Sequence, residues 1–163
     1  MRNIFDGLLK ALLLSYSLMI ISGCQTVGQT LNLDTDLRLT INVEADVNPD
    51  DAKKPSPLFL RFYELQSNKV FENADFIDLY ERDGDVLGAD MVAKQELRRL
   101  TPGEQREENF VLNPQTQYIA LYAEFYNYND SQFRVVFPVE ANNVFQDKIK
   151  IKITGNKMTL IEK

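Results

Sequence analysis

Hydrophobic and polar residues alternate with a period of two along much of the chain beyond position 35. The clearest case runs from Leu37 to Glu44, where every second residue is aliphatic and the residues between are polar. This alternation is typical of a strand with one buried face. Comparable runs bounded by turn-forming residues predict further strands at 58–63, 92–100, 105–112, 116–126, 132–139, 147–154 and 157–162. About eight short strands predict an all-β fold, namely a two-sheet antiparallel β-sandwich.

The stretch of residues 70–90 breaks this pattern and predicts a short helical insertion around residues 71–90. Asn73 is a candidate N-cap, and Asp75 would lie in the first turn, where the helix dipole favours an acid. The helix should stop near Asp83 and Gly84. Its large apolar residues are too many for an exposed helix of this length. We therefore expect the insertion to pack against a sheet.

The run 116–126 is apolar on both faces of the expected strand. Ile119, Leu121, Ala123 and Phe125 would point to one side, and Tyr118, Ala120, Tyr122 and Tyr126 to the other. A strand of this kind is covered on both faces, or one of its faces forms a binding surface. The helical insertion is a candidate cover for one face.

A hydrophobic run near the N-terminus ends at Cys24, the only cysteine of the chain. Arg2 and Lys10 precede the run, which is too short to span a bilayer comfortably, so it predicts a cleaved export signal. Its end, Ile21-Ser22-Gly23-Cys24, resembles a bacterial lipobox, which implies removal of residues 1–23 and attachment of acyl chains to Cys24. The alternative is an ordinary signal peptide with an unpaired thiol nearby, which secreted proteins usually avoid.

This interpretation divides the chain into a signal peptide at 1–23, a lipidated N-terminus with a flexible tether at 24–35, and a β-sandwich domain at 36–163. The tether is polar, with small residues and little periodicity. Gln25 follows the cysteine in place of an aspartate, which by resemblance to enterobacterial sorting rules implies an outer-membrane location, lipid-anchored and facing the periplasm. The segment after the tether is long enough for one domain with a sizeable core.

The composition leaves few groups for chemistry. A net charge of −6 argues against nucleic acid as a partner, because phosphates require a basic surface. The chain has no histidine and its one cysteine is assigned to lipid, which removes the commonest general base, zinc ligands and thiol nucleophile. Asp78, Asp83, Asp85 and Asp90 lack the spacing of an EF-hand loop, so we favour a turn with solvated acids over a calcium site. We predict no catalytic residue, metal or cofactor.

Two further segments are candidate surfaces. The connection 46–57 is longer than a hairpin needs and contains three prolines, which would preorder it for binding. A tolerated surface excursion fits the same residues. Lys148, Lys150 and Lys152 alternate with isoleucines, and we interpret them as a solvated strand face or a guard against edge pairing.

Several short motifs occur in order along the chain. They are Asn48-Pro49 to Pro55-Ser56-Pro57, Arg61-x-Tyr63-x-Leu65, Phe71-x-x-Ala74-Asp75-Phe76-x-x-Leu79-Tyr80, Leu87-Gly88-Ala89-Asp90 and Pro102-Gly103-Glu104. Together with the lipobox, their order and spacing resemble TssJ, the outer-membrane lipoprotein family of the bacterial type VI secretion system. The resemblance implies a transthyretin-like β-sandwich with a helical addition. It also implies a non-enzymatic role, in which the protein holds the secretion membrane complex by binding the periplasmic C-terminal domain of the inner-membrane protein TssM.

In that family the loop between the first two strands is the main partner contact, which by position implies residues 46–54. The implied partner-binding residues are Asp46, Val47, Asn48, Pro49, Asp50, Asp51, Ala52, Lys53 and Lys54. Val47 and Pro49 would supply apolar contacts, and the charged residues would set charge complementarity more than raw affinity. Acyl chains on Cys24 would supply the second attachment, to the outer membrane.

Two functions of other classes remain open. The chain could be a periplasm-facing lipoprotein that binds carbohydrate or a small ligand, with Tyr118, Tyr122 and Tyr126 as a stacking platform. Solvent exposure of these tyrosines would distinguish that function. The chain could also be a carboxylate-dependent envelope hydrolase, which would require an open cleft with two convergent acids.

Overall fold

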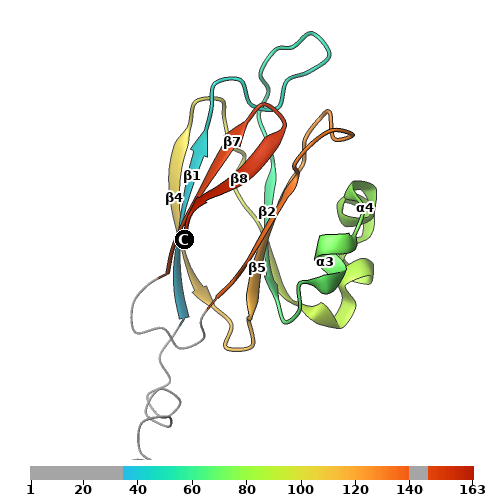
Figure 1. Cartoon of the computed structure of the whole chain (residues 1–163), viewed down its shortest axis with the longest axis vertical. Coiled ribbons are helices and arrows are strands. Elements are labelled where there is room, and N and C mark those ends of the chain that lie inside the picture. Colours follow the sequence, from blue (N-terminus) through green and yellow to red (C-terminus); the bar gives the residue numbers. More distant parts are fainter. Residues whose placement is uncertain (1–34, 140–146) are drawn as a thin grey trace, which may run out of the picture. The chain divides into compact units, whose positions relative to one another are not determined.

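The computed structural model describes residues 35–139 and 147–163 (Figure 1). The predicted signal peptide at 1–23, the predicted lipidation site at Cys24 and the tether up to residue 34 lie outside the described residues. None of the helices in the described residues has the length and hydrophobicity that a membrane span requires.

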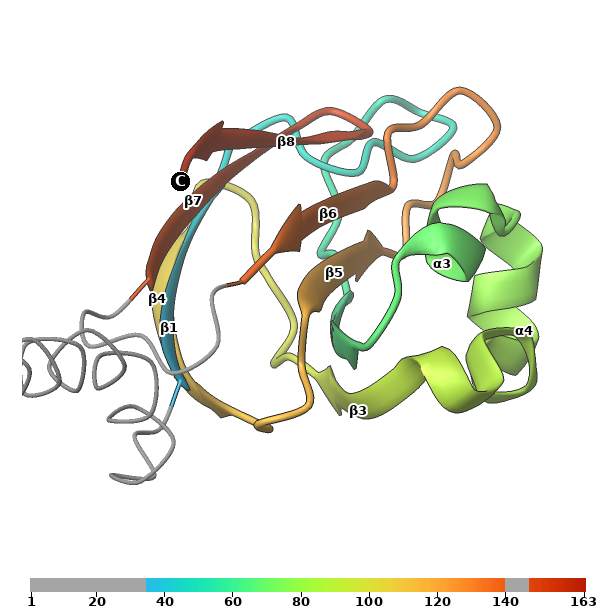
Figure 2. The same ribbon diagram turned by 60° about the horizontal axis from the view of Figure 1, so that its bottom comes forward.

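Two four-stranded sheets pack face to face and confirm the predicted sandwich (Figures 1 and 2). The strand order is β4-β1-β7-β8 in the first sheet and β3-β2-β5-β6 in the second. The strands are β1 (Thr35–Val43), β2 (Leu60–Leu65), β3 (Met91–Glu96), β4 (Gln105–Leu112), β5 (Tyr118–Ala123), β6 (Arg134–Pro138), β7 (Asp147–Thr154) and β8 (Lys157–Glu162). β4, β7 and β8 have the expected bounds, whereas the strands expected at 92–100 and 116–126 are shorter.

The main core lies between the sheets and is built from alternate residues of their strands. Leu37, Leu39 and Ile41 of β1 are fully buried, and the residues between them are more exposed, as the alternation predicts. From the opposite sheet, Phe62 of β2 stacks on Phe110 of β4 with ring centroids 4.0 Å apart. Burial of each such side chain stabilises the fold by about 1.5–3 kcal/mol. This core is the rigid support from which the loops project.

One pair of neighbouring strands departs from the antiparallel expectation. β1 pairs antiparallel with β4 but parallel with β7, from Leu37 opposite Asp147 to Val43 opposite Ile153. β6 belongs to the second sheet, so the chain crosses between the sheets before β7 and enters the first sheet at the end where β1 begins. The first sheet is therefore mixed, with a parallel pair at its centre.

The insertion consists of two α-helices and a 3-10 helix instead of one helix: α3 (Lys69–Asn73), α4 (Phe76–Leu87) and η1 (Gly88–Asp90). Asn73 ends α3 and is not an N-cap; its side-chain amide donates to the Lys69 carbonyl at 2.7 Å. The helices α3 and α4 are separate because the backbone of Ala74 and Asp75 is extended. Asp75 is therefore the N-cap residue of α4. The backbone leaves helical values at Arg82, one residue before the expected stop, and the helix then continues.

β5 is covered on both faces, as its residues predict. Ile119 and Leu121 lie in the core between the sheets, whereas Ala120 and Tyr122 lie in a second core beneath the helices. The buried helical residues over β5 are Phe71, Phe76, Leu79 and Leu87. Figure 2 shows α3 and α4 on the side of the second sheet that faces away from β1.

Candidate functional site

The connection between β1 and β2 leaves one end of the sandwich as an extended loop, at the top of Figure 1. Val47 is fully buried and belongs to the core between the sheets. Leu58 is also fully buried and exchanges two backbone hydrogen bonds with Leu100, at 3.0 and 2.9 Å. The loop is therefore inserted into the sandwich at both of its ends, and only the residues between them project.

Asn48 fixes the base of this loop with both ends of its side-chain amide. Its Nδ2 donates to the Pro57 carbonyl at 3.0 Å, and its Oδ1 accepts from the backbone N–H of Tyr126 at 2.7 Å. The Asn48 N–H donates to the Gly155 carbonyl at 2.7 Å, and the Asn48 carbonyl accepts from the Ser56 hydroxyl at 2.6 Å. Asn48 has a positive φ of 49°, which asparagine tolerates better than most residues. One residue thus joins the loop to the β5–β6 and β7–β8 connections.

A turn at Asp50 shapes the tip of the loop. The Asp50 N–H donates to the Lys54 carbonyl at 2.9 Å, and the Lys53 N–H donates to the Asp50 carbonyl at 2.8 Å. The Asp50 carboxylate also accepts the Lys54 N–H at 2.8 Å, as aspartate side chains often do in turns. The tip is consequently an ordered turn with a defined set of outward side chains.

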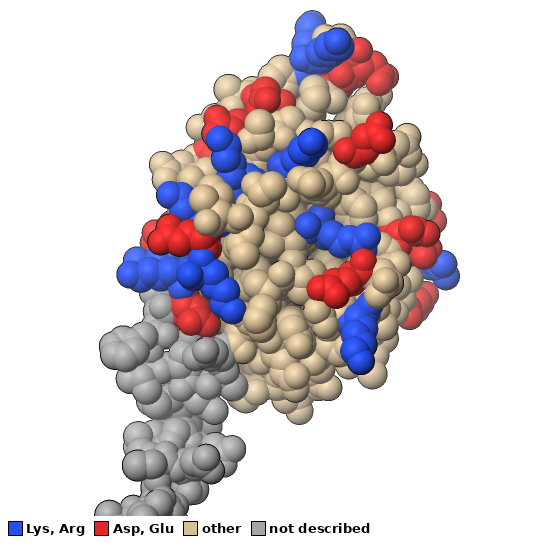
Figure 3. Space-filling view, viewed as in Figure 1, with Lys and Arg blue, Asp and Glu red and all other residues tan. Residues whose placement is uncertain are grey.

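The tip presents charges of both signs to solvent. The exposed residues are Asp46, Asp51, Ala52, Lys53 and Lys54, and Pro49 and Asp50 are half-buried. Asp51 accepts a hydrogen bond from the Tyr126 hydroxyl at 2.9 Å, and Asp46 accepts one from the Gly155 N–H at 3.1 Å. Figure 3 shows acidic and basic side chains next to each other at this end of the domain. In protein interfaces, charges of both signs contribute to specificity through charge complementarity.

Two residues that the family resemblance implied as partner contacts are not at the surface. Val47 is 0% exposed and Asn48 is 5% exposed. Val47 therefore cannot be the implied apolar contact, because the chain turns back into the core at this position. Asn48 supports the loop from beneath. Asp46 and residues 49–54 stay candidate contacts.

Replacing Asn48 with alanine is expected to lower the free energy of unfolding by about 1–3 kcal/mol, because the Pro57 carbonyl and the Tyr126 N–H lose their hydrogen-bond partner at the part-buried base of the loop. Alanine also tolerates the positive φ poorly. Glycine adopts the positive φ without strain but cannot make the hydrogen bonds of the Asn48 side chain. The Asn48→Gly protein should therefore be slightly more stable than the Asn48→Ala protein. Urea unfolding of the three proteins measures both effects. An unchanged midpoint for Asn48→Ala would show that this side chain does not hold the loop base.

A buried ionic cluster beneath α4 was not predicted by the sequence patterns. Arg61 of β2 donates from Nε to Glu124 at 2.6 Å and from Nη1 to Asp83 at 3.2 Å. The same Asp83 oxygen accepts the Tyr63 hydroxyl at 2.7 Å and the Lys94 ammonium at 3.0 Å. The Arg61 guanidinium further donates to α4 carbonyls at 2.9 and 3.3 Å. The cluster therefore ties α4 to β2, β3 and the end of β5. The available signal was an arginine and a tyrosine two positions apart, Arg61 and Tyr63, which therefore lie on the same face of a strand whose residues are mostly buried.

The surroundings of this cluster keep Asp83 charged. Burial alone would raise the pKa of the Asp83 carboxyl, but hydrogen bonds from Tyr63 and Lys94 outweigh burial and hold that pKa below its usual value. Burial raises the pKa of the Tyr63 phenol, and its bond to Asp83 raises it further. The Asp83 side chain is only 13% exposed, which corrects the expectation of a solvated acid in this segment.

The tyrosine platform expected of a carbohydrate-binding protein does not form. Tyr122 is fully buried beneath α4 and donates its hydroxyl to the Phe76 carbonyl at 3.1 Å. Tyr118 is half-buried on β5, whereas Tyr126 lies beyond the end of that strand and is exposed. The three rings therefore have different surroundings and share no stacking surface.

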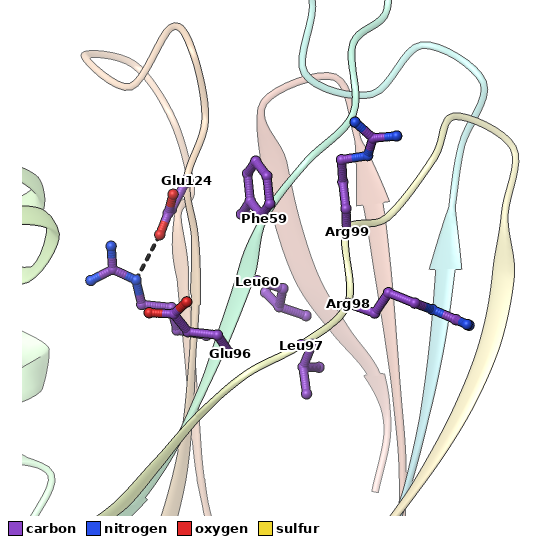
Figure 4. Close-up of a pocket in the computed structure, with 8 residues that line it drawn as sticks. Phe59, Leu60, Glu96, Leu97, Arg98, Arg99 and Glu124 are labelled. Carbon is purple, nitrogen blue, oxygen red and sulfur yellow. Dashed lines mark hydrogen bonds and ion pairs between the residues drawn. The ribbon is translucent and has the colours of Figure 1, made fainter.

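An open cavity beside β2 contains two acids, each of which already has a cationic neighbour. The cavity has a volume of about 470 Å³ and is lined by Glu96 and Glu124 among others (Figure 4). Glu124 accepts a hydrogen bond from Arg61 at 2.6 Å, and Glu96 lies 3.7 Å from the Lys94 ammonium. This arrangement neutralises the carboxylates instead of pairing them for acid–base chemistry. Within residues 35–139 and 147–163, no group of three or more acids, histidines or cysteines could hold a metal ion.

Comparisons with known proteins point to one family. A family model described as type VI secretion lipoprotein, with the names VasD, EvfM and TssJ, matches residues 35–156. The T6SS lipoprotein TssJ1 from Pseudomonas aeruginosa is 25% identical, with a TM-score of 0.73 over 80% of this chain and 97% of that chain. Lip of Serratia marcescens, a membrane-bound component of the type VI secretion system, is 22% identical, with a TM-score of 0.73 over 80% of this chain and 99% of that chain.

A third similar chain comes from a structure described as the T6SS protein TssM C-terminal domain from EAEC. It is 25% identical, with a TM-score of 0.64 over 77% of this chain and 99% of that chain. No curated protein matches the chain.

Proposed function

The chain belongs to the type VI secretion lipoprotein family that includes TssJ, and we propose that it anchors the membrane complex of this secretion system to the outer membrane. In this proposal, acyl chains on Cys24 enter the membrane, and the loop at residues 46–54 binds the periplasmic C-terminal domain of the inner-membrane protein TssM. The protein acts as a non-enzymatic connector, whose work is attachment at two sites.

The observation that carries the proposal is the ordered loop that projects from one end of the sandwich. Its base is fixed by Asn48 and its tip by the Asp50 turn, so binding costs little further conformational entropy. The choice of partner is supported by the similar chain from the structure described as the TssM C-terminal domain.

The tip residues divide into two roles in this proposal. Pro49 supplies an apolar contact beside the half-buried part of the turn. Asp51, Lys53 and Lys54 are exposed, so they act at the rim of the interface. Rim charges mainly change the association rate and its salt dependence, and less the affinity.

Replacing residues 49–55 with a Gly/Ser linker of equal length is expected to weaken binding to the TssM C-terminal domain by about 100-fold or more, because the tip loses both its contacts and its order. Val47, Asn48 and Ser56 stay in place, so the fold should be retained. Titration calorimetry on the full chain, purified in detergent, measures the affinity, and circular dichroism checks the fold.

Pro114→Gly is the matched control for this replacement. Pro114 lies in the exposed turn after β4, and Leu112 of that strand pairs with Thr35, at the end of β1 opposite to the loop. The control should bind like the unsubstituted protein. Full affinity of a folded linker variant contradicts the assignment of the loop, whereas no binding by the unsubstituted protein contradicts the choice of partner.

A further inference from the structure

Four of the eight large apolar side chains that are exposed in the described residues gather in one groove. Phe59, Ile77, Tyr80 and Tyr126 are 52%, 40%, 49% and 58% exposed, and all four line a cavity of about 460 Å³. Phe59 directly precedes β2, Ile77 and Tyr80 belong to α4, and Tyr126 follows β5. Single exposed apolar residues are ordinary on protein surfaces, whereas a contiguous group of them marks a binding surface.

The floor of this groove is a preformed aromatic cluster. Phe76 stacks on Tyr128 with ring centroids 4.4 Å apart and an interplanar angle of 6°, and on Tyr80 at 6.2 Å. Phe133 meets Phe76 edge-on at 5.2 Å. Phe125 also lines the groove and is 2% exposed. The rings hold one another in place, so the groove exists before anything binds.

Three polar side chains of the lining, Asn48, Ser56 and Glu124, are already used in hydrogen bonds within the protein. Asn48 uses both ends of its side-chain amide in the loop base, and Ser56 donates its hydroxyl to the Asn48 carbonyl. Glu124 accepts from Arg61. A sugar requires several available donors and acceptors for its hydroxyls, whereas an apolar side chain requires none. The groove therefore fits an apolar side chain better than a carbohydrate.

Negative charge at the groove selects what accompanies that side chain. The Glu124 carboxylate in the lining is already bound to Arg61, so the negative charge at the rim comes from Asp51, which accepts the Tyr126 hydroxyl at 2.9 Å. A second copy of this chain, with a net charge of −6, would bring like charge to the rim. A segment with a basic residue beside an apolar one fits better.

The groove and the loop form one surface. Asn48 and Asp51 of the loop bind the backbone N–H and the hydroxyl of Tyr126, and Tyr126 is part of the groove rim. A domain that contacts the loop tip therefore extends over the groove.

We propose that the groove receives an apolar or aromatic side chain of the periplasmic partner domain, presented next to a basic residue that faces Asp51. This inference rests on the proposed function and adds a second contact to the same partner. Side chains that enter a preformed, desolvated pocket commonly dominate the affinity of an interface. The loop and the groove then contact the same partner domain, and both contribute to the affinity.

The double substitution Phe59→Ala and Ile77→Ala tests the groove. Both side chains are exposed, so the fold should be retained, and the Kd for the TssM C-terminal domain is expected to rise about 10-fold or more. Val111→Ala with Ile161→Ala is the matched control, because these side chains are 67% and 50% exposed on strands of the other sheet. Titration calorimetry on the full chain in detergent measures all three affinities.

A charge substitution tests the second part of the proposal. Asp51→Asn keeps an acceptor for the Tyr126 hydroxyl but removes the charge. Its association with the partner domain should be a few-fold slower at low salt, and the difference should fade at high salt. An unchanged association rate at low salt would contradict the proposal that a basic residue of the partner faces Asp51.

Each outcome of the groove test separates the groove from the loop. If the groove variant and the control variant bind equally well, the groove is not a contact, while the loop assignment stands. If the groove variant loses self-association but keeps its Kd for the partner domain, the occupant is a second copy, which also overturns the proposal. If the unsubstituted protein does not bind the partner domain, both the groove and the proposed function are wrong.

Discussion

Replacing Arg61 with alanine is expected to lower the free energy of unfolding by about 3–5 kcal/mol, which is the usual cost of removing one member of a buried ion pair. Glu124 and Asp83 would lose their shared cation at positions where their side chains are 18% and 13% exposed. The Leu79 and Tyr80 carbonyls of α4 would lose their donor as well. Urea unfolding followed by circular dichroism measures the loss.

Arg82→Ala is the matched control for this substitution. Arg82 lies on α4 and also binds an aspartate, Asp78 at 2.7 Å, but its side chain is 60% exposed. Exposed ion pairs contribute little to stability, so this variant should unfold close to the unsubstituted protein. Arg61→Lys keeps a positive charge but lacks the planar guanidinium that reaches both acids. Its loss of unfolding free energy should therefore lie between those of Arg61→Ala and Arg82→Ala. Equal losses for Arg61→Ala and Arg82→Ala would show that the cluster does not hold α4.

Replacing Cys24 with serine is expected to move the protein from the membrane to the soluble periplasmic fraction and to abolish secretion. A hydroxyl cannot carry the thioether-linked diacylglycerol, and each methylene of an inserted acyl chain stabilises the membrane-bound state by about 0.8 kcal/mol. The loop at residues 46–54 is untouched, so the purified variant should bind the TssM C-terminal domain with unchanged affinity. Membrane fractionation and a secretion assay measure the two effects.

Gln25→Asp is the control that keeps the cysteine. This variant should stay membrane-bound, but in the inner-membrane fraction, as the resemblance to enterobacterial sorting rules implies. If the Cys24→Ser protein stays in the membrane in cells without TssM, the prediction of a lipid anchor at Cys24 is wrong.

Features that depend on local periodicity could be predicted from the sequence. The alternation from Leu37 to Glu44 predicts β1 with its buried face, because successive side chains of a strand point to opposite sides. The two apolar faces of β5 predict a cover on both sides, and the helices supply the second cover over Ala120 and Tyr122. The connection at residues 46–57 could also be predicted as a candidate binding surface, because its length and its prolines are local properties of the sequence.

Features that depend on distant partners could not be predicted. Asp83 stands beside a glycine, as a solvated turn residue would, yet its burial comes from Arg61, which is 22 positions away. The buried state of Asn48 depends on Tyr126, 78 positions away. The parallel pairing of β1 with β7 was missed for a related reason, since alternation shows which face of a strand is buried but not its direction.

β1 runs directly between the two sides of this domain where attachment is proposed. The chain enters β1 at Thr35, after the tether, and leaves it at Val43, before the loop. Tension between the membrane and the partner would act along the axis of this strand. β4 and β7 pair with β1 over most of its length, and their hydrogen bonds run across it. The bonds would be loaded together in shear instead of opening one after another, so the strand that carries the pull is the one least easily drawn out of the sheet.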